Sequence, residues 1–307
     1  MSSTSPLTAV GNLVKGALIG MAELVPGISG GTVALIVGIY ERALHNGNLL
    51  IDAVKDRSAQ KFKEVDWPFL IAIALGMVGA VFGMSTVMHS FVENYPEISK
   101  GLFLGMVAVS ILVPLGMVDP REAKAKRLKL VILFALGALA AFFGTGFTST
   151  PHENPSLIMI FFAAMVAVCA LILPGLSGSF LLLAMGLYSP VMESLSNREW
   201  DVILVFVLGA VVGVTCFVKF LDWLLSTHRT VTLIFMAGLM LGSLRALWPW
   251  QTDHADLLAP YGNQLPVWFA VAVGALAVAG LLFYDYRQGR SGSTPGHSEV
   301  KEESDPQ

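Results

Sequence analysis

The stretch LPGLSGS at residues 173–179 interrupts one long apolar segment, and VPGISGG at residues 25–31 interrupts another in the same way. Proline removes a backbone donor and clashes with the preceding helical turn, while glycine permits a sharp change of direction. Both motifs therefore predict a helix broken in the middle of an apolar segment. Because lipid offers no hydrogen-bond partners, backbone broken at membrane depth must be packed in protein or line a polar cavity.

Residues around the two motifs also match, which indicates an internal repeat. Each copy reads as a hairpin followed by three crossing helices, and an odd number of crossings inserts the second copy upside down. Inverted repeats with broken helices meeting at the midplane are typical of secondary transporters. At two constant separations, Pro26, Gly27, Ser29, Gly30, Gly38, Tyr40, Gly76, Gly105 and Ser110 match Pro174, Gly175, Ser177, Gly178, Gly186, Tyr188, Gly209, Gly238 and Ser243.

The composition is that of a membrane protein. Of the 307 residues 55% are hydrophobic and 13% are charged, against about 25% charged in soluble domains. Residues 68–92, 130–152, 154–192 and 257–284 contain no Asp, Glu, Lys or Arg, and about 20 apolar residues suffice to span a bilayer. We predict spanning helices at 67–92, 98–118, 129–147, 201–225, 230–247 and 266–286.

Basic residues orient these helices through the positive-inside rule. Lys and Arg gather in 51–66 and 119–129, whereas 93–97, 148–156 and 248–265 contain neither. If the six helices cross the membrane alternately inward and outward, the basic loops 51–66 and 119–129 and both termini lie in the cytoplasm. The interrupted segments, 7–48 and 154–195, must each begin and end on one side, so we expect re-entrant helical hairpins. The alternative is two kinked pairs of spanning helices.

The expected fold is an all-α polytopic membrane protein with two inverted-topology repeats, at 1–147 and 148–286. Residues 287–307 are polar and are predicted to form a disordered cytoplasmic tail. A net charge of -3 without a basic face excludes nucleic-acid binding. Cys169 and Cys216 lie in apolar runs, so neither disulfides nor a thiolate metal site is indicated, and no cofactor is expected. The N-terminus lacks the pattern of a cleaved signal peptide.

The residues that follow each break are candidate ligands for an anion. A helix that begins there presents free N–H donors and the positive end of its dipole, which suits phosphate. Alternatively, the serines only cap their helices. The predicted site comprises Gly27, Ser29, Gly30, Gly31, Thr32, Gly175, Ser177, Gly178 and Ser179, with Arg245 as a further phosphate ligand unless it snorkels.

Charged residues within apolar segments are costly and indicate function. Glu23 lies three residues before Pro26, and its counterpart in the second copy is Leu171. We expect Glu23 to couple transport to protons or sodium ions. Lys219 and Asp222 lie one helical turn apart and could pair with each other. The other candidates for coupling or gating are Glu41, which we expect near the interface, and His89, near the outer end of its helix.

The segments GMAELVPGISGGTVALIVGIYERAL (20–44) and LILPGLSGSFLLLAMGLYSPVMESL (171–195) resemble the polyprenyl-phosphate transporter family. The resemblance covers about residues 7–286. It implies translocation of undecaprenyl phosphate, the bacterial lipid carrier, from the outer to the inner leaflet of the cytoplasmic membrane after cell-wall and surface-glycan assembly. It also implies that the phosphate meets Ser29, Gly30, Ser177 and Gly178. The expected partners are this lipid and the surrounding membrane lipids. Glycines in 137–146 and 209–213 suit close helix packing either within one protomer or between protomers, so the sequence allows a homo-oligomer without requiring one.

Two other functions fit parts of the pattern. A transporter of a small anion or other solute would share the architecture but would enclose an aqueous site. A lipid phosphatase would need a nucleophile with an acid–base partner. The six histidines are scattered, and no HExxH or P-loop motif occurs. The sequence therefore predicts a lipid transporter and not an enzyme.

Overall fold

The computed structural model describes residues 6–24, 29–146, 152, 155–252 and 255–287 of the chain. Within these residues the regular structure is helical, apart from one isolated bridge between Gln251 and Leu257. The predicted all-α fold class is confirmed. Gly27 and the predicted tail at 288–307 lie outside the described residues.

Six segments in the described part of the chain are long and apolar enough to cross a membrane, as the sequence predicts. Capping residues fix where such helices begin. Asp66, for example, accepts a hydrogen bond from the Phe69 N–H at 3.3 Å. The segments are α5 (Trp67–Asn94), α6 and α7 (Pro96–Ser110 and Leu112–Gly116), α9 (Arg127–Gly144), α13 (Trp200–Thr227), α14 with the 3-10 turn η1 (Arg229–Ser243 and Leu244–Leu247) and α15 (Leu265–Arg287).

Each interrupted segment forms three helices rather than the two expected arms. The first contains α1 (Pro6–Glu23), α2 (Gly30–Ile36) and α3 (Tyr40–Lys55), and α2 packs back on α1. The second contains α10 (Leu157–Ile172), α11 (Gly178–Ala184) and α12 (Tyr188–Asn197), and α11 packs back on α10. The 16 residues of α10 reach about 24 Å, less than a hydrocarbon core of about 30 Å. The re-entrant hairpins stay a prediction.

In each interrupted segment a further glycine ends the short helix and separates it from the next one. Gly38 and Gly186 adopt φ of +70° and +68°, in the left-handed region that glycine enters without cost. After Gly38, the Ile39 N–H donates to the Ala34 carbonyl oxygen at 3.0 Å. After Gly186, the Leu187 N–H makes the equivalent bond to the Leu182 carbonyl oxygen at 2.8 Å. This is the Schellman ending of a helix. It explains why α2 and α11 both stop after seven residues.

The helix boundaries reproduce the internal repeat along the chain. α2 and α11 have 7 residues each, α5 and α13 have 28, and α6 and α14 have 15, at the separations that the sequence motifs show. Short helices outside this pattern are α4 (Ala59–Glu64) and α8 (Pro120–Ala125). The inverted insertion of the two copies in a bilayer stays a prediction.

Close helix pairs form the body of the protein. α1 packs along α5 and α10 along α13 within each copy, while α9 packs on α14 and α6 on α15 between the copies. Glycines allow these approaches. A Cβ added at Gly76 would lie 2.1 Å from the Leu13 carbonyl oxygen, and one at Gly209 would lie 2.3 Å from that of Phe161. Such packing is typical of membrane helices.

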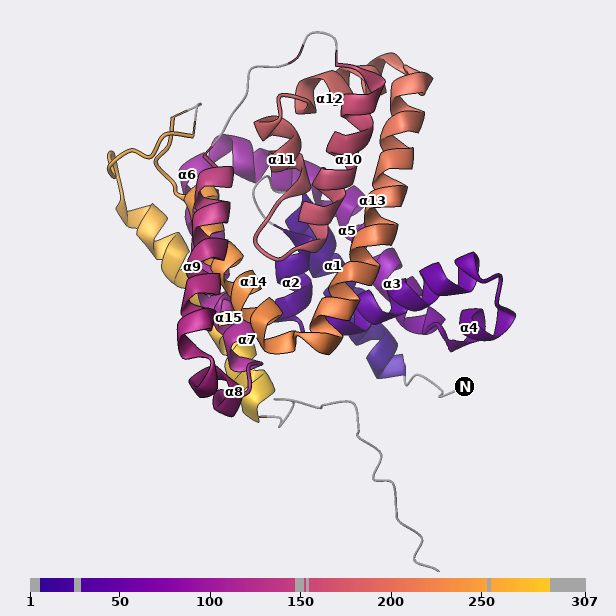
Figure 1. Cartoon of the computed structure of the whole chain (residues 1–307). Coiled ribbons are helices and arrows are strands. Elements are labelled where there is room, and N and C mark those ends of the chain that lie inside the picture. The colour runs from indigo at the N-terminus through magenta and orange to yellow at the C-terminus, as the bar shows by residue number, and fades with distance from the viewer. Residues whose placement is uncertain (1–5, 25–28, 147–151, 153–154, 253–254, 288–307) are drawn as a thin grey trace, which may run out of the picture.

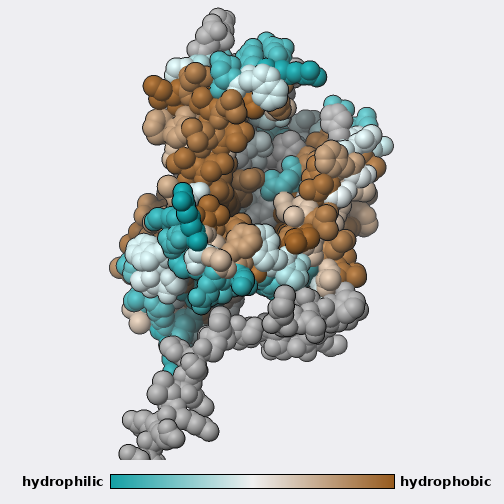
Figure 2. Space-filling view, turned by 90° about the vertical axis from the view of Figure 1, so that its right-hand side faces the viewer, coloured by the Kyte–Doolittle hydropathy of each residue, from teal (hydrophilic) through white to brown (hydrophobic). Residues whose placement is uncertain are grey.

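The surface and the ends of the helices agree with a membrane-spanning arrangement. Large apolar side chains are exposed along α5, α9, α13 and α15, and Figure 2 shows hydrophobic surface over much of the height of the molecule, with hydrophilic residues above and below. The start of α1, α4, α8 and the end of α15 all lie in the lower half of Figure 1. The basic segments 51–66 and 119–129 therefore share one side, as the predicted alternation requires.

Candidate functional site

The two helix breaks meet between the copies, where hydroxyl groups of the first contact the backbone of the second. The Ser29 hydroxyl donates to the Leu173 carbonyl oxygen at 3.0 Å. The Gly175 N–H donates to the Thr32 hydroxyl oxygen at 2.8 Å. Ser29 and Thr32 are both buried. Polar groups released by the broken helix are thus satisfied by protein, as burial at membrane depth demands.

Tyr40 and close glycine contacts hold the same junction. The Tyr40 hydroxyl donates to the Ile172 carbonyl oxygen at 3.0 Å. A Cβ added at Gly31 would lie 2.7 Å from that carbonyl oxygen, so only glycine fits there. Gly175 adopts φ of +87°, and a Cβ on it would lie 2.7 Å from the Cα of Met240 on α14. The second break is therefore held from two sides.

Glu23 lies at the first break and contacts its backbone. Its Oε1 accepts a hydrogen bond from the Gly30 N–H at 2.9 Å, while its side chain stays accessible. An acidic side chain therefore occupies one of the donors predicted for phosphate. The counterpart of Glu23 is Leu171, so the second break has no equivalent acid.

The serines do not act as simple helix caps. Ser29 and Ser177 occupy N-cap positions, but neither side chain makes a capping hydrogen bond. The hydroxyls of Ser177 and Ser179 lie 3.0 Å apart, and Ser179 is exposed. Since α2 and α11 each have only seven residues, the case for an anion site rests on hydrogen-bond donors more than on a long-helix dipole.

Arg245 lies away from the breaks, at the end of the helix that packs against Gly175. Its Nη1 donates to the Phe142 carbonyl oxygen at 3.2 Å, and its Nη2 to that of Ala255 at 3.3 Å. Its guanidinium also stacks 4.8 Å from the centre of the Phe142 ring. Met240 and Arg245 are five residues apart, about 8 Å along a helix axis. Arg245 thus lies near the junction without touching it.

Charged residues bridge α3 to the second copy, in an arrangement that we call the polar clasp. Lys219 on α13 pairs with Asp52, not with Asp222, so the pairing of neighbours considered from the sequence is wrong. The reason is that α3 packs across α13 and presents an acid to the lysine. The clasp consists of the pairs Asp52–Lys219, Asn48–Asp222 at 2.7 Å and Glu41–Arg229 at 2.9 Å.

A further polar contact joins the copies beside the clasp. Glu122 on α8 accepts hydrogen bonds from Lys126 at 2.8 Å and from Thr230 at the start of α14. These bonds lower the pKa of Glu122, the larger cause being Lys126. The carboxylate therefore stays ionised and keeps joining α8 to α14. The side chain of His89 is outside the described part of the chain.

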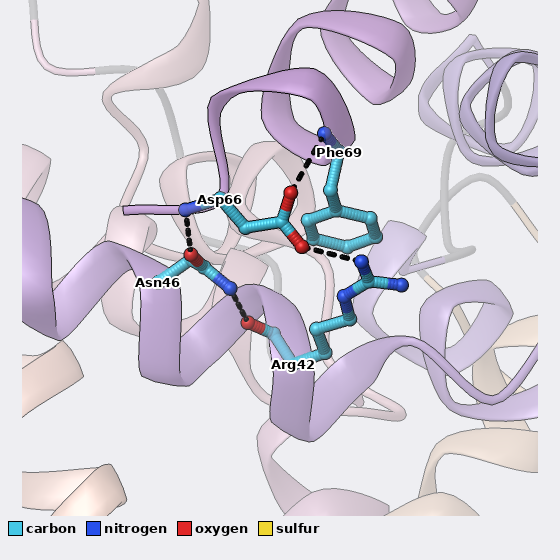
Figure 3. A network of polar contacts seen from close by, with 4 residues as sticks. All are labelled: Arg42, Asn46, Asp66 and Phe69. Carbon is cyan, nitrogen blue, oxygen red and sulfur yellow. Dashed lines mark hydrogen bonds and ion pairs between the residues drawn. The ribbon is translucent and has the colours of Figure 1, made fainter. Parts of the chain in front are cut away.

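Sequence reasoning missed the network that fastens α3 to the start of α5 (Figure 3). Arg42 pairs with Asp66 and lies 4.2 Å from the centre of the Phe69 ring. The Asp66 N–H donates to the Asn46 side chain at 2.7 Å. In the described part of the second copy there is a matching bond, in which the Ser194 hydroxyl donates to Glu199 at 2.7 Å. The sequence did contain a signal for this contact, because an acidic residue directly precedes tryptophan in both copies, as Asp66-Trp67 and Glu199-Trp200.

This fold and site define a class, namely multi-pass membrane proteins of two related halves whose broken helices meet, as in secondary transporters. The chain belongs to the VCA0040-like family, described as undecaprenyl phosphate translocase-like, which it matches over residues 19–265. The family resemblance seen in the sequence is confirmed.

Two relatives bear the name polyprenyl-phosphate transporter. The one from Vibrio cholerae is 34% identical over 259 residues, which are 83% of this chain and 82% of that protein. The one from Staphylococcus aureus is 28% identical over 254 residues, 78% of this chain and 86% of that protein. By these names the family is one of transporters and not of enzymes. No solved structure matches the chain.

Proposed function

We propose that this protein translocates undecaprenyl phosphate across the bacterial cytoplasmic membrane by alternating access, with the phosphate held where the two helix breaks meet. The observation that supports this most is the junction itself, where Ser29 and Thr32 reach the backbone of the second break. A phosphate crossing about 30 Å of hydrocarbon needs such a protein-lined polar path. The polyprenyl chain remains in lipid. The names of the two relatives support the choice of substrate.

The positive-inside rule gives the orientation within this proposal. The side that holds α4, α8 and the two described ends faces the cytoplasm, because the Lys- and Arg-rich segments lie there. Arg245, near the opposite side, is proposed to attract the phosphate of lipid in the outer leaflet. Its guanidinium is held by two neutral carbonyl oxygens, so its charge stays available to an anion.

The test follows leaflet exchange of undecaprenyl phosphate in proteoliposomes. Wild type is compared with the double variant Ser177→Ala/Ser179→Ala, whose hydroxyls bond to each other rather than across the junction. Ser226→Ala is the matched control, since this serine bonds only within its own helix. We expect rapid exchange with wild type and the control, and at least about tenfold slower exchange with the double variant, as one or two charge-assisted hydrogen bonds are lost.

Other outcomes would overturn the proposal. No acceleration of undecaprenyl phosphate exchange by wild type, together with uptake of inorganic phosphate, would indicate a small-anion transporter. Equal exchange of ordinary phospholipids would indicate a nonselective scramblase. Unchanged exchange in the serine variant would move the headgroup site away from the second break.

We further propose that Glu23 couples transport to an ion. Its carboxylate and an incoming phosphate would share the Gly30 N–H, so uptake of a proton or a sodium ion by Glu23 favours phosphate binding. With Glu23→Gln we expect exchange to continue but to lose its response to proton and sodium gradients. Glu193→Gln, which removes an exposed carboxylate on α12, serves as the control. A Glu23→Gln protein with an unchanged gradient response would refute this role.

A further inference from the structure

Matching tyrosines at the starts of α3 and α12 occupy different environments. Tyr40 is 7% exposed, and its hydroxyl donates to the Ile172 carbonyl oxygen of the other copy. Tyr188, its counterpart, is 38% exposed, and its hydroxyl has no hydrogen-bond partner among the described residues. At the separation that relates the two tyrosines, the counterpart of Ile172 is Leu24, at the end of α1. The repeat thus supplies Tyr188 with an equivalent acceptor that it does not use here.

The helices that carry these tyrosines also differ in whether they contact the other copy. α3 crosses to the other copy, packs on α13 and is fastened there by the polar clasp. α12 packs on α11 and α13 of its own copy, and within the described chain it makes no comparable contact with α5, the counterpart of α13. Figure 2 shows the surface hollowed in its upper half, the half that holds α12 in Figure 1. Within the described chain, the α3 side is fastened to the other copy and the α12 side is not.

We propose that Tyr40 and Tyr188 are positioning residues that latch two alternate states of the transporter, an inference that rests on the alternating access proposed above. In the state seen, Tyr40 holds the second break and the α3 side is closed. In the opposite state the Tyr188 hydroxyl donates to the Leu24 carbonyl oxygen, α12 packs on α5 and the polar clasp opens. With the α3 side in the cytoplasm, the structure is the outward-open state, which receives lipid from the outer leaflet.

The proposal makes the two tyrosines act in opposite directions. Removing one latch hydroxyl costs one hydrogen bond in one state only, which shifts the equilibrium about fivefold. Tyr40→Phe therefore favours closure of the α12 side, and Tyr188→Phe favours the state seen here. The double variant returns close to the wild-type equilibrium. A tyrosine needed only for packing would not produce this sign reversal.

The experiment measures distances in the full-length protein reconstituted in lipid nanodiscs, with Cys169 and Cys216 replaced by alanine. Spin labels are placed at Val87 on α5 and Leu195 on α12, which are 57% and 54% exposed. Pulsed dipolar spectroscopy gives the populations of long and short separations. Tyr95→Phe, at an exposed tyrosine between α5 and α6, is the matched control. Each variant is also measured with Lys219→Met, which weakens the clasp and brings both states into the measurable range.

Opposite shifts for Tyr40→Phe and Tyr188→Phe, with none for Tyr95→Phe, support the latch. Shifts in the same direction, or no shift in either background, overturn it. Leaflet exchange by the wild type separates this result from the proposed function. Exchange without opposite shifts refutes the latch alone, whereas opposite shifts without exchange of undecaprenyl phosphate refute the substrate and leave the latch standing.

Discussion

At the scale of single residues, the junction depends on side chains that serve the backbone of another segment. Thr32 accepts the Gly175 N–H, and its counterpart in the second copy is Phe180, which has no hydroxyl. This contact therefore exists in one direction only. A buried N–H without a partner costs about 1–3 kcal/mol, so the Thr32 hydroxyl contributes measurably to the stability of the second break.

Thr32→Val tests this contact, since valine keeps the shape and removes the acceptor. We expect the free energy of unfolding to fall by about 1–3 kcal/mol, because the Gly175 N–H stays buried without a partner. Thr32→Ser, which keeps the hydroxyl, should lose less. Denaturation of the purified proteins in detergent measures the difference, and equal stability of the valine and serine variants would contradict the assignment.

Gly175→Ala tests the close approach at the second break. Its left-handed φ and the 2.7 Å distance from an added Cβ to the Cα of Met240 leave no room for a methyl group. We expect little folded protein, measured as the monodisperse fraction after extraction. Gly11→Ala is the control, because its added Cβ meets nothing within 4 Å and alanine favours α1 by about 1 kcal/mol.

At the scale of elements, the spanning helices were predictable, but the helix ends at Gly38 and Gly186 were not. The spanning helices can be identified from uncharged runs that are long enough to cross a bilayer, and this needs little knowledge of the tertiary structure. After Gly38 come Ile39 and Tyr40 and then the charged pair Glu41-Arg42, so hydropathy would place the end of the apolar run after Tyr40 and shows no helix end at the glycine itself. The glycine recurs as Gly186, but only backbone hydrogen bonding shows that both positions end a helix.

Gly38→Asn and Gly38→Ala together test whether Gly38 ends α2. Nothing lies within 4 Å of an added Cβ, so only the positive φ opposes substitution. Because asparagine visits the left-handed region more readily than alanine, we expect Gly38→Ala to lose about 1 kcal/mol and Gly38→Asn less. Thermal unfolding monitored by circular dichroism would show the order, and alanine equal to asparagine would refute it.

The sequence predicts where the helices break, but it does not predict what the broken segments contact. The Pro-Gly motifs placed the breaks correctly because they depend on local backbone chemistry. The partner of Ser29 lies 144 residues away and is fixed by how the two copies pack. The same limit applies to Lys219, for which helix spacing suggested Asp222 and the fold supplies Asp52.

At the scale of the whole molecule, the polar clasp is present on one side only. Glu41 and Asn48 of α3 have Ser189 and Ser196 as counterparts. Asp52 lies in the part of α3 that extends beyond the shorter α12, so the second copy cannot form the same ion pairs. In the alternating access proposed above, the two states would therefore be unequal in their charge interactions. The clasp favours the state in which the α3 side is closed.

Charge reversal tests the clasp through a reporter cysteine. Gly47→Cys fits between α3 and α13, since its Cβ would lie 3.6 Å from Val218. We expect slow thiol labelling in the Cys169→Ala/Cys216→Ala background and several-fold faster labelling with Lys219→Asp, because two acids then repel. The exchanged pair Asp52→Lys/Lys219→Asp should restore slow labelling. Failure of the exchanged pair to do so would show that the ion pair does not hold this side closed.

The bonds between the two breaks also bear on how the chain is made. Ser29 and Thr32 leave the ribosome well before Leu173 and Gly175, whose backbone they bind in the finished protein. During synthesis the first half therefore waits in the membrane with polar groups that its own residues do not satisfy. We expect it to remain loosely inserted, and open to membrane chaperones and proteases, until the second half arrives. The contact proposed to complete the transport path would thus also mark the completion of biogenesis.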